Sequence, residues 1–143
     1  MLPMNPQQAK QLNEIGYRYD LKLMILHGSY ATGKTHPHSD LDIAVLGRRE
    51  IDRDKFVDLY GELAALLDDH PGRELDLKTL HRKDPLFLYQ VMKTSELVYG
   101  SPTAYHELKA YAFRLYQDSR DLRRLEQILT HRLLEHIKHD VGS

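Results

Sequence analysis

Residues 23–46, LMILHGSYATGKTHPHSDLDIAVL, decide the fold of this chain. An apolar run ends in a Gly-Ser turn, a short polar loop follows, and a second apolar run opens with two aspartates one residue apart. Short apolar runs bounded by turn residues are typical of buried strands. The stretch therefore predicts two strands joined by a polar loop, with the candidate functional residues in the loop and at the start of the second strand.

One interpretation is a phosphate-binding loop, because residues 28–35, GSYATGKT, satisfy the pattern G-x-x-x-x-G-K-[ST]. Lys34 would then contact the outer phosphates and Thr35 would hold magnesium. The motif requires its lysine to open a helix, since the helix N-terminus completes the anion site. Pro37 follows closely and residues 40–46 alternate as a strand, which leaves room for about one and a half helical turns. The phosphate-loop interpretation is therefore the less favoured one.

A second interpretation joins the Gly-Ser turn and the two aspartates into one site. Alternate residues of a strand share a face, so Asp40 and Asp42 project together, roughly 6.5 to 7 Å apart along the strand. Two carboxylates so placed repel each other unless a cation lies between them, and Mg²⁺ accepts oxygen ligands together with substrate phosphates. Gly28 lets the backbone approach a phosphate, to which Ser29 offers a hydroxyl and an amide. We therefore expect a magnesium and phosphate site.

The Gly-Ser turn, ten further residues and the Asp-x-Asp strand resemble the signature of the DNA polymerase beta-like nucleotidyltransferase superfamily, and most of all its minimal members, the MNT proteins. That family has a third carboxylate on a neighbouring strand. Residues 74–80, ELDLKTL, offer Asp76, which faces away from its two leucine neighbours. The resemblance implies that Asp40, Asp42 and Asp76 are catalytic residues and metal ligands.

At this length the chain is most similar to the MNT antitoxins that pair with HEPN ribonuclease toxins. In that family the antitoxin transfers AMP from ATP to a tyrosine of its toxin, and the resemblance implies the same reaction here. It implies two Mg²⁺ ions on the three acids, with Asp76 as the base beside the acceptor, while Gly28 and Ser29 hold the outer phosphates. Lys34 and Lys78 are candidates for neutralising the triphosphate charge.

Two other functions remain open. Transfer of a nucleotide to a small molecule such as an aminoglycoside uses the same core, although enzymes of that kind usually add a sizeable acceptor-binding domain. A non-enzymatic antitoxin would instead neutralise its toxin by occlusion through an apolar face of its last helix.

The composition excludes several classes of protein. The chain has 143 residues, and because none is a cysteine, disulfides and thiolate metal sites are impossible. No apolar run reaches the roughly 18 residues that span a bilayer, and the N-terminus lacks a signal pattern, so a cytoplasmic location is expected. A formal net charge of −1 gives no global attraction to nucleic acid, which is therefore not expected as a direct substrate.

The order of the remaining patterns predicts an α+β fold, a small mixed β-sheet backed by helices. Capping residues and apolar periodicity indicate each element in turn. The expected elements are a helix from Asn5-Pro6 that ends at Gly16, a strand at 21–27, a helix capped by Asp52, a strand at 74–80, a helix from Asp84-Pro85, an extended segment at 96–100, and a helical region from Ser101-Pro102 to about His139 that is interrupted near Asp118-Ser119.

We expect one compact domain, with a nucleotidyltransferase core at residues 1–100 and a C-terminal helical extension at residues 101–143 packed on the core. Within the extension an apolar stripe recurs at helical spacing. Its members are Leu122, Leu125, Leu129, Leu133 and Ile137. We expect this stripe to pack on the chain's own sheet, and the alternative is a face that binds a partner.

Overall fold

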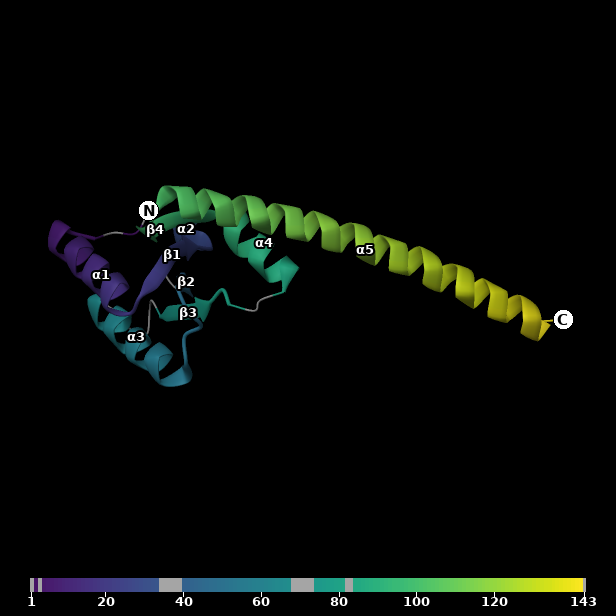
Figure 1. The fold of residues 1–143 in the computed structure, drawn as a ribbon, viewed down its shortest axis with the longest axis horizontal. Helices are drawn as coiled ribbons and strands as arrows, with labels where there is room; N and C mark the ends of the chain where they lie inside the picture. Colours follow the sequence, from purple (N-terminus) through teal and green to yellow (C-terminus); the bar gives the residue numbers. More distant parts are fainter. Residues whose placement is uncertain (1, 3, 34–39, 68–73, 82–83, 143) are drawn as a thin grey trace.

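The computed structural model describes residues 2, 4–33, 40–67, 74–81 and 84–142 of the chain. Its elements follow the expected order, with one short extra helix after the first strand. They are α1 (Pro6–Arg18), β1 (Leu21–His27), α2 (Ser29–Thr32), β2 (Leu41–Gly47), α3 (Arg53–Leu66), β3 (Leu75–Thr79), α4 (Pro85–Lys93), β4 (Ser95–Gly100) and α5 (Pro102–Gly142) (Figure 1). Among the described residues, no helix is both long enough and apolar enough to cross a bilayer.

The four strands form one mixed sheet in the order β3-β2-β1-β4. Strand β1 pairs antiparallel with β2 and with β4, whereas β2 and β3 run parallel. The antiparallel pairing of β1 with β2 lets a short loop join them, which is the reverse of the parallel crossover that a phosphate-loop fold requires. The prediction of an α+β fold with a small mixed sheet is confirmed.

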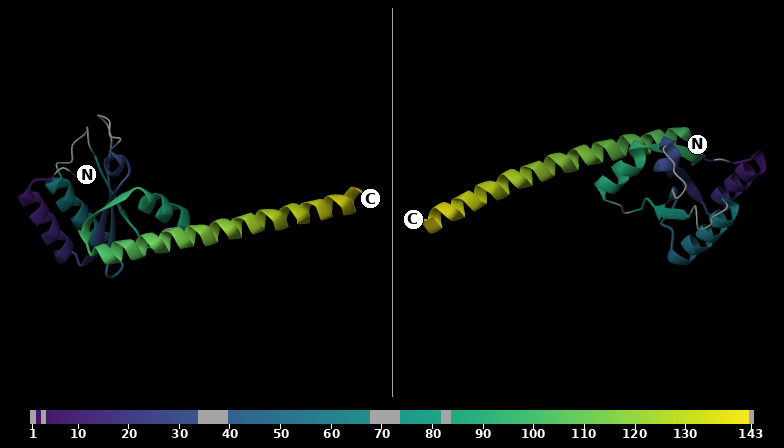
Figure 2. Two further views of the ribbon diagram at one scale, coloured as in Figure 1. Left: turned by 90° about the horizontal axis from the view of Figure 1, so that it is seen from above. Right: turned by 180° about the vertical axis from the view of Figure 1, so that it is seen from behind.

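Helices cover both faces of the sheet, α1 and α3 on one side and α4 and α5 on the other (Figure 2). Side chains alternate along each strand, so Ile43 of β2 is buried with α1 and α3, while Ala44 is buried with α4 and α5. The face that carries Asp42 is accessible only at the start of β2, because Ala44, two residues further on, is fully buried.

Three of the predicted helix starts are capped as the sequence indicates. The side chain of Asn5 accepts a hydrogen bond from the backbone amide of Gln8 at 2.8 Å, and the Gln8 side chain accepts one from the backbone amide of Asn5 at 3.0 Å, which completes a capping box. Asp52 and Asp84 each accept from the amide three residues later, at 2.8 and 2.9 Å.

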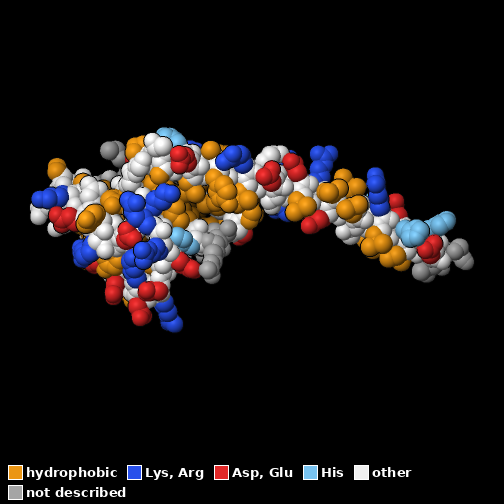
Figure 3. Space-filling model, viewed as in Figure 1, with side chains coloured by type: hydrophobic (Ala, Val, Ile, Leu, Met, Phe, Trp, Pro, Cys, Tyr) orange, Lys and Arg blue, Asp and Glu red, His pale blue; other side chains and the backbone are white. Residues whose placement is uncertain are grey.

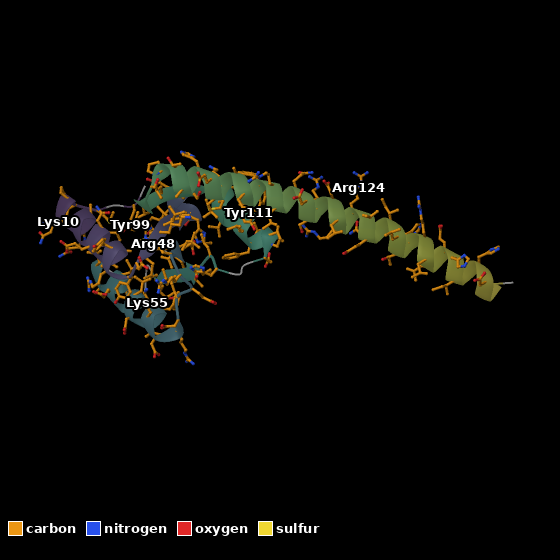
Figure 4. The ribbon with its side chains drawn as sticks, in the orientation of Figure 1. Lys10, Arg48, Lys55, Tyr99, Tyr111 and Arg124 are labelled. Carbon is orange, nitrogen blue, oxygen red and sulfur yellow. The ribbon has the colours of Figure 1, made fainter. Side chains whose placement is uncertain are left out.

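The expectation that Gly16 ends α1 is wrong, since the helix continues to Arg18. Gly16 is buried inside the helix, where the ring of Tyr99 on β4 packs against its Cα. Tyr99 is labelled in Figure 4. A glycine at this position therefore reflects close packing between α1 and β4 rather than a helix terminus.

The expected interruption near Asp118-Ser119 is also wrong, because α5 is one continuous helix of 41 residues. Neither residue breaks a helix, and the flanking residues are good helix formers. Only the first part of α5 packs on the core, through buried residues such as Tyr105 and Ala112. Figure 4 labels Tyr111 on this part and Arg124 on the part that projects beyond it.

The apolar stripe of α5 does not pack on the chain's own sheet, contrary to expectation. Leu122 and Leu133 are 56% and 59% exposed, and the other three stripe residues are exposed as well. Strands of at most seven residues span about 23 Å, whereas a helix of 41 residues is about 60 Å long, so α5 outruns the sheet. The boundary between core and extension at residue 100 stays a prediction.

Candidate active site

The register of the sheet places four polar side chains in one row, at the edge where β1 ends and β2 and β3 begin. Asp42 lies opposite Asp76 on β3 and opposite His27 on β1, and His27 lies opposite Ser95 on β4. Residues directly paired across strands share a face of the sheet. Two of the predicted carboxylates, Asp42 and Asp76, are thereby brought together from sequence positions 34 residues apart.

Gly28 follows His27 and makes the turn beside Asp42. Its φ of 74° lies in the region that favours glycine, and a Cβ at this position would overlap the Asp42 carboxylate. The Gly28 carbonyl accepts hydrogen bonds from the amides of Ala31 and Thr32 at 3.1 and 3.2 Å, which fold residues 29–32 into the single turn of α2. Glycine is therefore needed at position 28 for two reasons. It adopts the positive φ readily, and it has no Cβ to overlap the Asp42 carboxylate.

The electrostatics of the row centre on Asp42. Burial raises the pKa of Asp42 to about 6, reinforced by the charge of Asp76, a hydrogen bond to Asp76 and the charge of Asp40, and opposed by Lys78. The Lys78 ammonium lies 3.6 Å from a carboxylate oxygen of Asp76, so it offsets part of the negative charge. The carboxylates carry more negative charge than the neighbouring groups balance.

This donor set fits a hard divalent cation, since carboxylate oxygens are its preferred ligands and a cation would relieve the repulsion that raises the pKa of Asp42. Asp40 is exposed at the start of β2 and acts on Asp42 through its charge. Within the described ranges, no three His, Cys, Asp or Glu side chains converge on one point. The assignment of Asp40, Asp42 and Asp76 as joint metal ligands stays a prediction.

His27 is one of two residues of this row, with Ser95, that the sequence analysis did not single out. Burial lowers the pKa of His27, with the charge of Lys78 acting in the same direction and Asp76 opposing it. Its Nε2 is buried and has no hydrogen-bond partner among the residues that the structure describes. A histidine that ends an apolar strand directly before a Gly-Ser turn is the sequence signal that could have indicated it.

The structure describes one of the two candidate lysines, Lys78. Lys78 shares a face with Asp76 as the alternation predicts, and its ammonium also lies 5.4 Å from the centre of the Phe87 ring on α4. Lys34 lies outside the described residues. The roles of Gly28, Ser29, Lys34 and Lys78 in binding a nucleotide stay predictions.

Comparison with known protein families identifies the family to which this site belongs. The family model of polymerase beta nucleotidyltransferases matches residues 10–104, which include the whole sheet and the row of polar side chains. The chain belongs to the polymerase beta nucleotidyltransferase family. Gly28, Asp42 and Asp76 of this nucleotidyltransferase domain thus lie within the matched region.

Similar proteins of this family include the protein adenylyltransferase MntA of Shewanella oneidensis, which is 33% identical over 81 residues, 57% of this chain and 55% of that protein. The matched part spans about half the length of that relative. A toxin–antitoxin complex with AMP-PNP contains a chain of similar fold, with a TM-score of 0.68, 24% identity and coverage of 85% of this chain and 98% of that one. A complex of tri-AMPylated Shewanella oneidensis HEPN toxin with MNT antitoxin gives a TM-score of 0.64, 22% identity and coverage of 88% and 99%.

Proposed function

We propose that this chain is a nucleotidyltransferase antitoxin that transfers AMP from ATP to a tyrosine hydroxyl of a cognate HEPN ribonuclease toxin. The observation that carries the proposal is the in-register pair of Asp42 and Asp76 beside the turn at Gly28. Membership of the polymerase beta nucleotidyltransferase family supports nucleotide transfer as the class of reaction. The proposal includes a cytoplasmic location, where ATP is available.

The proposed acceptor comes from the relatives. The similar Shewanella oneidensis protein is a protein adenylyltransferase, and solved complexes of similar fold contain a HEPN toxin that carries AMP groups. These likenesses support a protein acceptor in preference to a small molecule. A complex with AMP-PNP supports ATP as the nucleotide donor.

In the proposed reaction, an oxygen of the acceptor forms a bond to the α-phosphorus of ATP, and the bond from that phosphorus to pyrophosphate breaks. Asp76 accepts the proton that the acceptor hydroxyl loses. The Ser29 amide and hydroxyl bind the β- and γ-phosphates, and Gly28 allows the backbone to approach them. Holding the triphosphate in this way aligns the leaving pyrophosphate with the attack.

Asp42 and Asp76, with Asp40, would hold two Mg²⁺ ions, which when bound neutralise the charge that develops on the attacking and leaving oxygens. Lys78 is paired with Asp76 and half-exposed, so its ammonium is available to a phosphate oxygen at the same place. Lys34 is proposed as a second cation for the triphosphate.

The test is transfer of radiolabel from [α-³²P]ATP, with Mg²⁺, to the protein product of the adjacent gene. The same incubation with [γ-³²P]ATP should leave the acceptor unlabelled, because the γ-phosphate leaves in pyrophosphate. Asp42→Asn should abolish labelling without unfolding the chain, since it removes a negative ligand and creates no cavity. Glu14→Gln, an exposed acid on α1, is the matched control and should label normally.

Each outcome of this experiment supports a different one of the candidate functions. A mass gain of one or more AMP groups on a tyrosine supports the proposal. Binding to the acceptor protein with no mass gain indicates occlusion, and the absence of both indicates a small-molecule acceptor. Normal labelling by Asp42→Asn would contradict the assignment of this carboxylate.

A further inference from the structure

The row of polar side chains on the sheet contains one buried ring nitrogen, Nε2 of His27. Because the strands run in the order β3-β2-β1-β4, His27 lies between Asp42 on one side and Ser95 on the other. Its Nε2 is shielded from solvent and forms no hydrogen bond with any atom of the described ranges. A buried polar atom without a partner opposes folding and is rare in native proteins. The position of this nitrogen in the row therefore calls for a functional explanation.

The side chain of Ser95 is already engaged by other partners. Its hydroxyl donates to the carbonyl of Met92 on α4 at 2.8 Å. The Tyr105 hydroxyl on α5 lies 2.6 Å from the Ser95 Oγ and donates to the Ser95 carbonyl at 3.1 Å. These contacts draw Ser95 toward the two helices, which leaves Asp42 as the polar neighbour of His27 in the row.

The carboxyl group of Asp42 is engaged on its other side. It forms a hydrogen bond with Asp76 across the pair of β2 and β3, and this bond helps to raise the pKa of Asp42. Two carboxyl groups share a hydrogen bond only when one of them carries a proton. A divalent cation between them replaces that proton, because it balances both negative charges. A carboxylate has about four lone-pair sites, so a cation on the Asp76 side leaves sites of Asp42 available to His27.

We propose that His27 is a positioning residue of the metal site, whose buried Nε2–H donates a hydrogen bond to the ionised Asp42 carboxylate and holds it in the orientation that binds the cation. A neutral imidazole supplies this donor without adding a charge that repels the cation, and burial favours the neutral ring. Direct ligation by His27 is the alternative, but three ligand side chains do not converge within the part of the chain that is described. The positioning role rests on the assignment of the cation to Asp42 and Asp76 in the proposed function.

The first test measures binding of Mn²⁺ alone at pH 7.5, from the electron paramagnetic resonance signal of the free ion. Mn²⁺ takes the same oxygen ligands as Mg²⁺. His27→Phe keeps a ring and removes the donor, so its dissociation constant for Mn²⁺ should rise at least about tenfold. His27→Gln carries an amide N–H at a similar reach and should return to within about threefold of the wild type.

The outcomes of this titration separate the role of His27 from the proposed function. Equal affinity of the wild type and His27→Phe for Mn²⁺ would overturn the role of His27 and leave the proposed function standing. Failure of the wild type to bind Mn²⁺ would overturn both. Neither ATP nor an acceptor is present, so a failure of AMP transfer alone does not change the result.

The matched control is the same substitution at a distant histidine. His139 is exposed in the last turns of α5, where Figure 3 shows histidine side chains in pale blue. His139→Phe should bind Mn²⁺ as the wild type does. Urea unfolding in EDTA at pH 5, where Asp42 keeps its proton, is the control for folding. The midpoint of His27→Phe should equal or exceed that of the wild type, because an unpaired buried nitrogen is removed, and a lower midpoint would overturn the proposal.

A second measurement follows the ring nitrogen directly, by NMR of the chain labelled with ¹⁵N at histidine, in Mg²⁺ at pH 7.5. The Nε2–H proton of His27 should lie downfield of its position in Asp42→Asn, because a hydrogen bond to a carboxylate is stronger than one to an amide. The same position in both chains would overturn the proposal. An Nε2 that has lost its proton in Mg²⁺ would also overturn it, by showing that the nitrogen binds the ion itself.

Discussion

The partly buried position of Asp42 disfavours folding at any pH where its carboxyl is charged. Its pKa of about 6 lies above the ordinary value of 3.8, so the folded chain binds this proton more tightly than the unfolded chain does. The contribution of this group to stability is therefore fully present below about pH 4. It is lost as the pH rises through 6, where the buried carboxylate becomes charged beside Asp76.

The first prediction follows from this loss of stability as the pH rises. In chelator at pH 7.5, Asp42→Asn should raise the free energy of unfolding by about 1 kcal/mol. This gain is well below what the rise of the pKa from 3.8 to about 6 would give in full, because the carboxyl is partly exposed and screened by solvent. At pH 3 the gain should nearly vanish, because the carboxyl is then protonated in both the folded and the unfolded chain. Urea unfolding at the two pH values measures both, with Glu14→Gln as the control that should show neither effect. An equal gain at both pH values would contradict the electrostatic explanation.

The second prediction compares two glycines with almost the same backbone. Gly28 and Gly33 have φ of 74° and 76°, so alanine strains both, by about 1 kcal/mol or more. At Gly33 the new Cβ meets no described residue within 4 Å, whereas at Gly28 it meets the Asp42 carboxylate. Gly28→Ala should therefore reduce AMP transfer at least about a hundredfold, since even a displacement of about 1 Å is costly in catalysis. Gly33→Ala should retain most activity in the same assay.

A site residue could be predicted from the sequence where its position depends on its own segment alone, and not where it depends on how two strands pair. Asp42 and Asp76 follow from strand alternation, which fixes the face on which each side chain lies. That they lie directly opposite each other depends on the register between β2 and β3, which no single segment encodes. His27 was missed for the same reason, because its place beside Asp42 arises from pairing between strands.

At the scale of a helix, replacing glycine by alanine is expected to have opposite effects on stability at Gly16 and at Gly61. Both lie inside helices, α1 and α3, where alanine is favoured over glycine by about 1 kcal/mol. Within the described part of the chain a Cβ at Gly61 meets nothing within 4 Å, so Gly61→Ala should stabilise the chain by about that amount. Gly16→Ala should destabilise it by about 1 to 3 kcal/mol, since the new methyl group overlaps the Tyr99 ring. Chemical denaturation of both variants measures the difference, and stabilisation by both would show that Tyr99 moves aside freely.

The elements that the sequence predicts well are those with local signals at their ends. Asp52 and Asp84 cap their helices as expected, and the apolar run from Leu21 to His27 is strand β1. The failures arise where packing overrides the local signal. Gly16 is a contact with β4 rather than a stop, and periodicity alone could not tell whether the stripe of α5 meets the chain's own sheet or extends past it.

The whole molecule consists of a core with two packed faces and a helix that runs on beyond it. Residues 121–140 are all exposed, so they contribute little burial to the core and gain little stability from it. A chain that ends at Arg120 should therefore unfold with a thermal midpoint within about 3 °C of that of the full chain. It should also label its acceptor at a similar rate while showing less helix by circular dichroism. A fall of about 10 °C or more in the midpoint would mean that the removed residues pack on their own core, contrary to their exposure in the structure.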